Sequence, residues 1–268
     1  MTTPILRQLI ELYRAHGITV TTGLNPARFG WPHALFTHFF KDGQNITEGL
    51  GISALEVHIL ADIMQSLNPK SAFVIGNSQG WSTLAMALSS PQCRILAIDA
   101  GFDRASLDGL ALTEKLAANA GAQVSAKRGI SPADVPTLLQ NFGHAPELIF
   151  IDGYHSNEQV VADYTATRPH AAADAVYILH DVWTCGLEPG MKKIRELGGF
   201  DGGLLNASCS GIAILYPRAR AAVMDPLLRA YSIDGVANDQ LHRIAWRHRH
   251  PKLWRWQRRW NRWTGKRA

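Results

Sequence analysis

An alternation of short apolar runs with helix-forming stretches constrains the fold of this chain more than any other feature. Helix candidates near 80–90, 104–120, 131–141 and 156–171 lie between runs that have the character of buried strands, at 72–76, 94–99, 122–127, 147–152 and 175–181. This alternation favours a mostly parallel sheet with helices on both faces. In such a sheet ligands bind at the carboxyl ends of the strands, so the residues that follow each strand carry most of the functional information.

The residues before the first of these strands predict two helices and a cover segment. Apolar spacing over residues 4–16 predicts an amphipathic helix that ends at Gly17. Residues 18–50 are rich in glycine, proline and aromatic side chains, and we expect an irregular, partly packed cover. Ser53 and Glu56 have the spacing of a capping box, which predicts a second helix starting there.

The end of the apolar pattern predicts where the sheet stops. Two runs at 203–208 and 211–217 are close together and predict an antiparallel hairpin at the sheet edge. The chain is therefore expected to divide into an N-terminal helix and cover at 1–50, a central α/β domain at 51–217, a helical extension at 218–242 and a basic tail at 243–268.

Composition favours a globular intracellular protein. The chain is 46% hydrophobic and 18% charged, which is ordinary for a domain with a sizeable core. Its three cysteines are odd in number and none has metal-ligand spacing, so we expect no disulfide framework and a reducing cytoplasm. The first residues lack a signal-peptide pattern, and no run of ~18 apolar residues predicts a membrane span.

Charge is distributed unevenly along the chain. All 22 acidic residues precede Arg243, whereas ten of the 27 basic residues lie from Arg243 onward, so the tail carries +10 and the remainder −5. Helical spacing in the tail places four apolar residues on one face, beside a basic face: Leu253, Trp256, Trp260 and Trp263, with Arg255, Arg259, Arg262 and Lys266. This pattern favours an anionic membrane surface. Docking on the acidic body of its own or a partner subunit, as in a homo-oligomer, is the second interpretation, and nucleic acid is the third.

The turn after the first strand predicts a nucleotide-type ligand. Gly76 and Gly80 permit a tight turn, and the backbone N–H groups of the next helix point toward a ligand there. Asp99 ends the second strand, 23 positions after Gly76, where a carboxylate can accept hydrogen bonds from both ribose hydroxyls. A glycine turn alone is weak evidence for a nucleotide site, but together with Asp99 it favours an adenosine-type ligand.

Two other enzyme classes share parts of this pattern. Residues 76–80 match G-x-S-x-G, and the order Ser78, Asp152, His180 is that of an α/β-hydrolase triad. A hydrolase elbow normally follows several strands, whereas here about 70 residues of helix and cover precede it. A nicotinamide oxidoreductase is disfavoured because the chain has no Tyr-x-x-x-Lys pair. A non-catalytic protein that binds a membrane or a partner through the tail is a further alternative.

Four ionisable residues follow two strands of the predicted sheet. Asp152 and His155 follow the fourth strand, and His180 and Asp181 follow the fifth. Such a concentration is costly unless the groups pair, bind metal or do chemistry. We expect His155 to act as general base toward a hydroxyl. Asp152, Asp181 and His180 have the donor types for a divalent cation, and suit Mn²⁺, Fe²⁺ or Zn²⁺ better than Mg²⁺; alternatively, His180 is a structural residue bonded to Asp152.

The segments FVIGNSQGWSTLAMAL, AIDAGFD, ELIFIDGYHSNEQVVADY and VYILHDVW resemble the class I S-adenosylmethionine-dependent methyltransferases, in the branch that methylates small molecules and sugars. The resemblance covers roughly residues 50–216 and implies a Rossmann-like, doubly wound, seven-stranded, mostly parallel sheet with an antiparallel last strand. It implies that S-adenosylmethionine is held by Gly76, Asn77, Ser78, Gly80, Trp81, Ser82, Asp99 and Asp152, with adenine near Phe102, Gly129, Ile130 and Ser131.

The resemblance also assigns expected roles to the ionisable cluster. In metal-dependent relatives the positions of Asp152, His180 and Asp181 bind the cation, although the residue matching His180 is usually a carboxylate. In sugar-methylating relatives His155 matches the general base. The expected activity is therefore O-methylation of a hydroxyl on a sugar, glycolipid or other small molecule, in the cytoplasm or at the inner membrane face.

Overall fold

A computed structural model describes residues 3–47, 51–102, 104–251 and 253. The chain divides into two compact units, Met1–Tyr231 and Ser232–Ala268. None of the described helices is long and apolar enough to cross a membrane.

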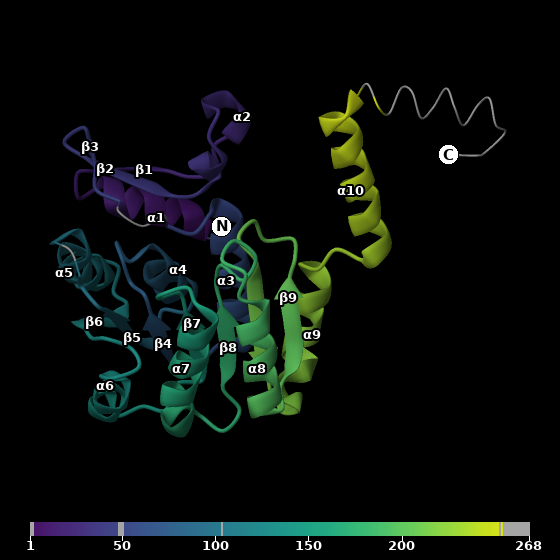
Figure 1. Cartoon of the computed structure of the whole chain (residues 1–268). Helices are drawn as coiled ribbons and strands as arrows, with labels where there is room; N and C mark the ends of the chain where they lie inside the picture. Colours follow the sequence, from purple (N-terminus) through teal and green to yellow (C-terminus); the bar gives the residue numbers. More distant parts are fainter. Residues whose placement is uncertain (1–2, 48–50, 103, 252, 254–268) are drawn as a thin grey trace. The chain divides into compact units, whose positions relative to one another are not determined.

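A seven-stranded sheet forms the centre of the first unit (Figure 1). Its strands are β4 (Ser71–Ile75), β5 (Arg94–Asp99), β6 (Gln123–Arg128), β7 (Leu148–Ile151), β8 (Val176–Leu179), β9 (Asp201–Leu205) and β10 (Ile212–Tyr216). Their order is β6-β5-β4-β7-β8-β10-β9, and β10 runs antiparallel to both of its neighbours. The predicted doubly wound sheet with an antiparallel edge hairpin is confirmed.

Strand register brings the predicted site together. Ile75 on β4 pairs with Ile151 on β7, and Ile151 pairs with Leu179 on β8. The next residues, Gly76, Asp152 and His180, therefore leave the sheet side by side at its carboxyl edge. Because the chain first builds β5 and β6 on one side of β4 and then returns to β7 on the other, this edge is the switch point at which open α/β sheets bind ligands.

Helices cover both faces of the sheet. One face packs against α3 (Ala54–Leu67), α4 (Trp81–Ser89), α5 (Arg104–Asn119) and α9 (Ala221–Ala230), and the other against α6 (Val135–Phe142), α7 (Asn157–Thr167) and α8 (Glu188–Gly198). The capping box predicted for α3 is present: Ser53 Oγ accepts from the Glu56 backbone N–H, and Glu56 Oε2 accepts from the Ser53 backbone N–H.

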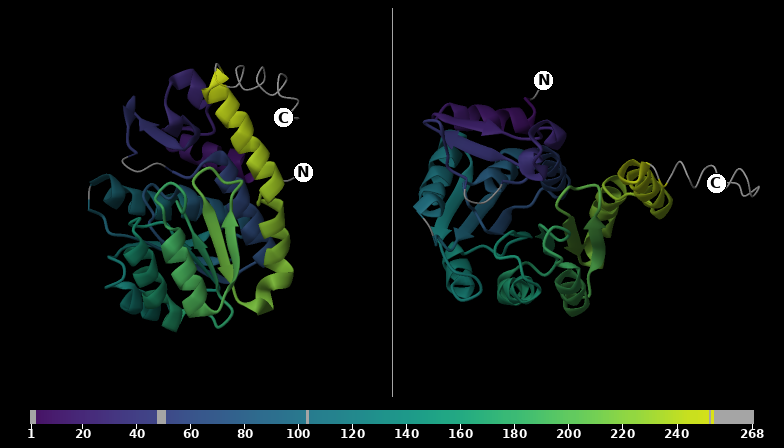
Figure 2. Two further views of the ribbon diagram at one scale, coloured as in Figure 1. Left: turned by 45° about the vertical axis from the view of Figure 1, so that its right-hand side comes forward. Right: turned by 45° about the horizontal axis from the view of Figure 1, so that its top comes forward.

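The N-terminal segment is more regular than its composition predicts. After α1 (Ile5–Arg14), β1 (Ile18–Thr21), β2 (His38–Lys41) and β3 (Gln44–Asn45) form a small antiparallel sheet, with α2 (Pro26–Phe29) and a 3₁₀ turn between the first two strands. Figure 2 shows this purple layer covering one end of the large sheet from two further directions. The expectation of an irregular cover was wrong because strands of four and two residues are too short to give a period-two pattern.

The second unit contains one described helix, α10 (Gly235–Arg249), capped by Asp234, whose carboxylate accepts from the Ala237 backbone N–H. None of its side chains is buried. The predicted Trp-rich face of the tail lies outside the described residues, apart from the exposed Leu253.

Candidate active site

The turn between β4 and α4 is shaped by close contacts with its neighbours. Gly76 has a φ of 93°, and a Cβ there would lie 2.0 Å from the backbone oxygen of Asp152. Gly80 has a φ of 82°, and a Cβ there would lie 2.0 Å from Thr113 Oγ1. These glycines are therefore required by the packing of the turn as well as by left-handed backbone geometry.

Asp99 at the end of β5 holds this turn in place. Its Oδ2 accepts hydrogen bonds from the backbone N–H groups of Asn77 and Ser78, at 3.0 and 2.8 Å, and its Oδ1 accepts from Gly101 at 3.0 Å. Asp99 also lines a cavity at the carboxyl edge of the sheet. Asp99 thus combines the predicted position for ribose recognition with a structural role in shaping the turn.

A cavity of about 810 Å³ lies over the carboxyl edge of the sheet. Its volume is in the range of ~300–1,000 Å³ that is usual for small-molecule and cofactor sites. Every expected cofactor residue except Gly80 lines it: Gly76, Asn77, Ser78, Trp81, Ser82, Asp99, Phe102, Gly129, Ile130, Ser131 and Asp152. Trp81 is nearly buried and packs on Tyr13 and Phe39, so it is chiefly a core residue that joins the N-terminal cover to α4.

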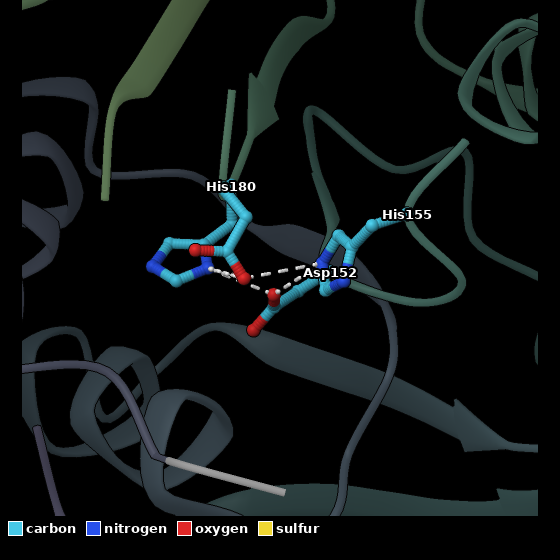
Figure 3. Close-up of side chains that lie close together, drawn as sticks. Asp152, His155 and His180 are labelled. Carbon is cyan, nitrogen blue, oxygen red and sulfur yellow. Dashed lines mark ion pairs between the residues drawn. The ribbon is translucent and has the colours of Figure 1, made fainter. Parts of the chain in front are cut away.

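The four predicted ionisable residues form one cluster: Asp152, His155 and Asp181 line the cavity, and His180 is buried. Figure 3 shows how Asp152, His155 and His180 lie together. Two imidazoles flank the Asp152 carboxylate: its Oδ1 lies 2.9 Å from His180 Nδ1 and 3.4 Å from His155 Nε2. Asp181 Oδ2 lies 3.5 Å from the same two nitrogens. Asp181 has a φ of 55°, a strained backbone conformation that is most often retained at functional sites.

Burial and the mutual charges of the cluster act in opposite directions on its proton affinities. Burial alone would raise the pKa of Asp152, but the neighbouring His180 and His155 outweigh it and lower this pKa. Burial alone would lower the pKa of His155, but Asp152 and Asp181 outweigh it and raise this pKa. The carboxylates therefore make His155 a stronger base than a free imidazole.

Glu56 is a member of the site that the sequence did not reveal. This side chain of α3 is fully buried, and its Oε2 lies 3.5 Å from His180 Nε2. Its Oε1 accepts from the backbone N–H of Ser210, at 3.0 Å, and from the Ser210 hydroxyl. Burial would raise the pKa of Glu56, but His180 and Ser210 lower it to about 2. His180 is thus held between carboxylates on both ring nitrogens.

Replacement of Glu56 by alanine is expected to destabilise the fold by about 3–5 kcal/mol, because one partner of a buried ion pair is removed while His180 stays buried. Urea unfolding measures this change. Exposed Glu196 on α8 provides the matched control, and Glu196→Ala should shift the unfolding free energy by less than about 0.5 kcal/mol. Equal effects of the two substitutions would show that Glu56 and His180 are not coupled.

The hydrolase alternative does not fit the observed geometry. Ser78 lies in the turn after the central strand β4, which is the first strand of the large sheet in the chain. His180 is engaged by Asp152, Glu56 and Ser210, and across the described ranges no hydrogen bond joins Ser78 to a histidine. A serine without its base is not an activated nucleophile.

Comparison with known proteins agrees with this geometry. Residues 73–182 match the family model for a methyltransferase domain, and no curated protein matches the chain. The O-methyltransferase of Bacillus cereus, solved in complex with SAH, is similar in structure, with 15% identity, a TM-score of 0.53, and coverage of 81% of this chain and 92% of that one. TomG of Streptomyces achromogenes, an O-methyltransferase of tomaymycin synthesis solved in complex with SAM, has 16% identity, a TM-score of 0.51, and coverage of 81% and 90%.

The strand order is that of the Rossmann-like fold of the similar methyltransferase structures, and the segment that matches the methyltransferase-domain model contains both the glycine turn and the ionisable cluster. The matched segment, residues 73–182, runs from within β4 to just past Asp181.

Proposed function

We propose that this protein transfers a methyl group from S-adenosylmethionine to a hydroxyl oxygen of a small molecule, with a sugar or glycolipid as the favoured acceptor. One observation carries the proposal: the half-buried His155, flanked by the Asp152 and Asp181 carboxylates, lines the same cavity as the glycine turn and Asp99. The cavity thus joins a nucleotide-type subsite to a group able to remove a proton.

S-adenosylmethionine, when bound, supplies a methyl group on a sulfonium centre. The chain's own residues act on the acceptor. His155 Nε2 lies 3.4 Å from Asp152 Oδ1 and 3.5 Å from Asp181 Oδ2, so the neutral ring has Nδ1 available for the proton of the hydroxyl. As the oxygen forms its bond to the methyl carbon and the carbon–sulfur bond breaks, this proton passes to His155, and the two carboxylates stabilise the resulting imidazolium.

The cluster also fits a divalent cation. His180 Nδ1 and His155 Nε2 are buried and have no well-directed hydrogen bond among the residues that the structure describes, although both lie close to carboxylates. Asp152, His180 and Asp181 would hold the ion, and this nitrogen-containing set suits Mn²⁺, Fe²⁺ or Zn²⁺ better than Mg²⁺. Such an ion would orient the hydroxyl and lower its pKa.

Cobalt(II) is expected to bind the purified protein and to give visible absorption of a nitrogen- and oxygen-ligated ion. Asp181→Asn should weaken this binding by about tenfold to a hundredfold, since it removes one charged ligand. Asp174→Asn, a surface change beside Arg220, should leave it unchanged. If neither cobalt, manganese nor zinc binds, the cluster is a network of ion pairs and no metal site.

A second proposal concerns the tail. We propose that residues 243–268, with ten basic and no acidic residues, contact anionic lipid headgroups. The described part contributes Arg243, Arg247 and Arg249 beside the exposed Ile244 and Trp246. The full chain should sediment with phosphatidylserine-containing vesicles and not with neutral ones. Replacing Arg243, Arg247 and Arg249 with glutamine should weaken binding to the anionic vesicles. Equal binding to both vesicle types, or a preference for nucleic acid, would contradict it.

Calorimetric titration with S-adenosylhomocysteine tests the main proposal. We expect micromolar binding by the wild-type protein, which would direct the next assays to transfer of labelled methyl groups to hydroxyl acceptors. A folded protein that binds no such ligand would overturn the proposal.

A further inference from the structure

A buried polar network separate from the ionisable cluster borders the cavity. It consists of Asp163 and Gln159 on α7 and of Ser131 after β6, and all three line the cavity. Asp163 is fully buried. Its Oδ1 accepts from Ser131 Oγ at 2.5 Å and from Gln159 Nε2 at 2.7 Å, while Gln159 also donates to the Ser131 carbonyl at 3.0 Å.

The second oxygen of Asp163 is left without a partner. Oδ2 is buried and forms no hydrogen bond with any residue that the structure describes. No ion pair compensates Asp163 within the described ranges, and burial raises its pKa against the opposing effect of Ser131 and Gln159. A buried carboxyl oxygen without a donor costs free energy comparable to a lost hydrogen bond, so its retention beside a cavity points to a donor on the ligand.

The surroundings define the kind of ligand that would supply this donor. Phe102 after β5 and Ile130 after β6 line the same cavity, and their side chains are 84% and 43% exposed. Exposed apolar side chains in the same cavity as a buried acceptor suit a flat, apolar ring that carries an amino group on one edge. Adenine has this combination, with its faces apolar and its N6 amino group a hydrogen-bond donor.

We infer that Asp163 recognises the adenine of the cofactor, with Oδ2 accepting a hydrogen bond from the N6 amino group. The inference rests on the proposed use of S-adenosylmethionine and adds the residue that reads the base. Ser131 and Gln159 hold the carboxyl group in place through Oδ1, which leaves Oδ2 available to a donor on the ligand.

The test compares S-adenosylhomocysteine with its deaminated counterpart, S-inosylhomocysteine, by calorimetry on the wild-type protein. Deamination replaces the N6 amino group by a carbonyl oxygen, so an acceptor would face the Asp163 acceptor. We expect the inosyl compound to bind roughly tenfold to a hundredfold more weakly. Equal binding would overturn the role of Asp163 and leave the proposed function intact, whereas failure of both compounds to bind would overturn both.

Asp163→Asn gives an independent measurement. The amide can still accept from Ser131 and Gln159, and its N–H then faces the cavity as a donor. The preference for the adenosyl compound should therefore shrink or reverse. Asp174→Asn, which makes the same charge change outside the cavity lining, should keep the wild-type preference. Because the wild-type comparison needs no variant, poor folding of Asp163→Asn would not rescue the inference from equal binding.

Discussion

Replacing His155 with alanine is expected to lower turnover by about 10²–10⁴-fold, the usual contribution of a general base. The imidazole lies next to Asp152 and Asp181, and no other described side chain that lines the cavity combines a neutral basic nitrogen with a carboxylate partner. The affinity for S-adenosylhomocysteine should change little, because His155 is not among the residues expected to bind the cofactor. Single-turnover methyl transfer and calorimetry measure the two effects separately.

A surface histidine gives the control for this experiment. His144 is exposed, its ring contacts that of Phe142, and it does not line the cavity, so His144→Ala should have wild-type turnover. If His155→Ala instead abolished binding of S-adenosylhomocysteine while the protein stayed folded, His155 would be a cofactor ligand and the base would have to be sought elsewhere.

The central sheet could be predicted because buried parallel strands are continuous apolar runs, and the hairpin because its two runs are adjacent in sequence. The sequence of α8, in contrast, has too few apolar residues at helical spacing to predict a helix there. Ile194 is the one large side chain of α8 that is fully buried. The helix packs closely on α7 at Gly190, where a Cβ would lie 2.6 Å from Val160 Cγ2. The short strands of the cover were missed for a similar reason, since two to four residues do not define a period.

The ionisable cluster could be predicted from the strand ends, because register in a parallel sheet places consecutive strand termini side by side. Glu56 and Asp163 could not. Glu56 already has a local explanation as the third residue of a capping box, and its contact with His180 joins positions 124 residues apart. Asp163 and Gln159 are one helical turn apart on α7, but helical spacing alone does not show which face meets a cavity.

Asp99→Ala is expected to weaken the binding of S-adenosylhomocysteine by roughly tenfold to a hundredfold. The substitution removes the carboxylate expected to accept from the ribose, and it also frees the backbone N–H groups of Asn77, Ser78 and Gly101. Both losses act on the cofactor subsite, because the turn that Asp99 holds is the one that lines the cavity. Calorimetric titration of both proteins measures the change.

The two roles of Asp99 can be separated with a second substitution. In Asp99→Asn the amide oxygen can still accept from some of the backbone N–H groups that the carboxylate binds. The amide nitrogen is a donor, so the remaining backbone N–H groups lose their acceptor. If ribose recognition dominates, both variants should lose affinity while urea unfolding changes little. If turn stability dominates, affinity and unfolding free energy should fall together. Wild-type affinity in Asp99→Ala would place the nucleotide elsewhere in the cavity and contradict the cofactor site.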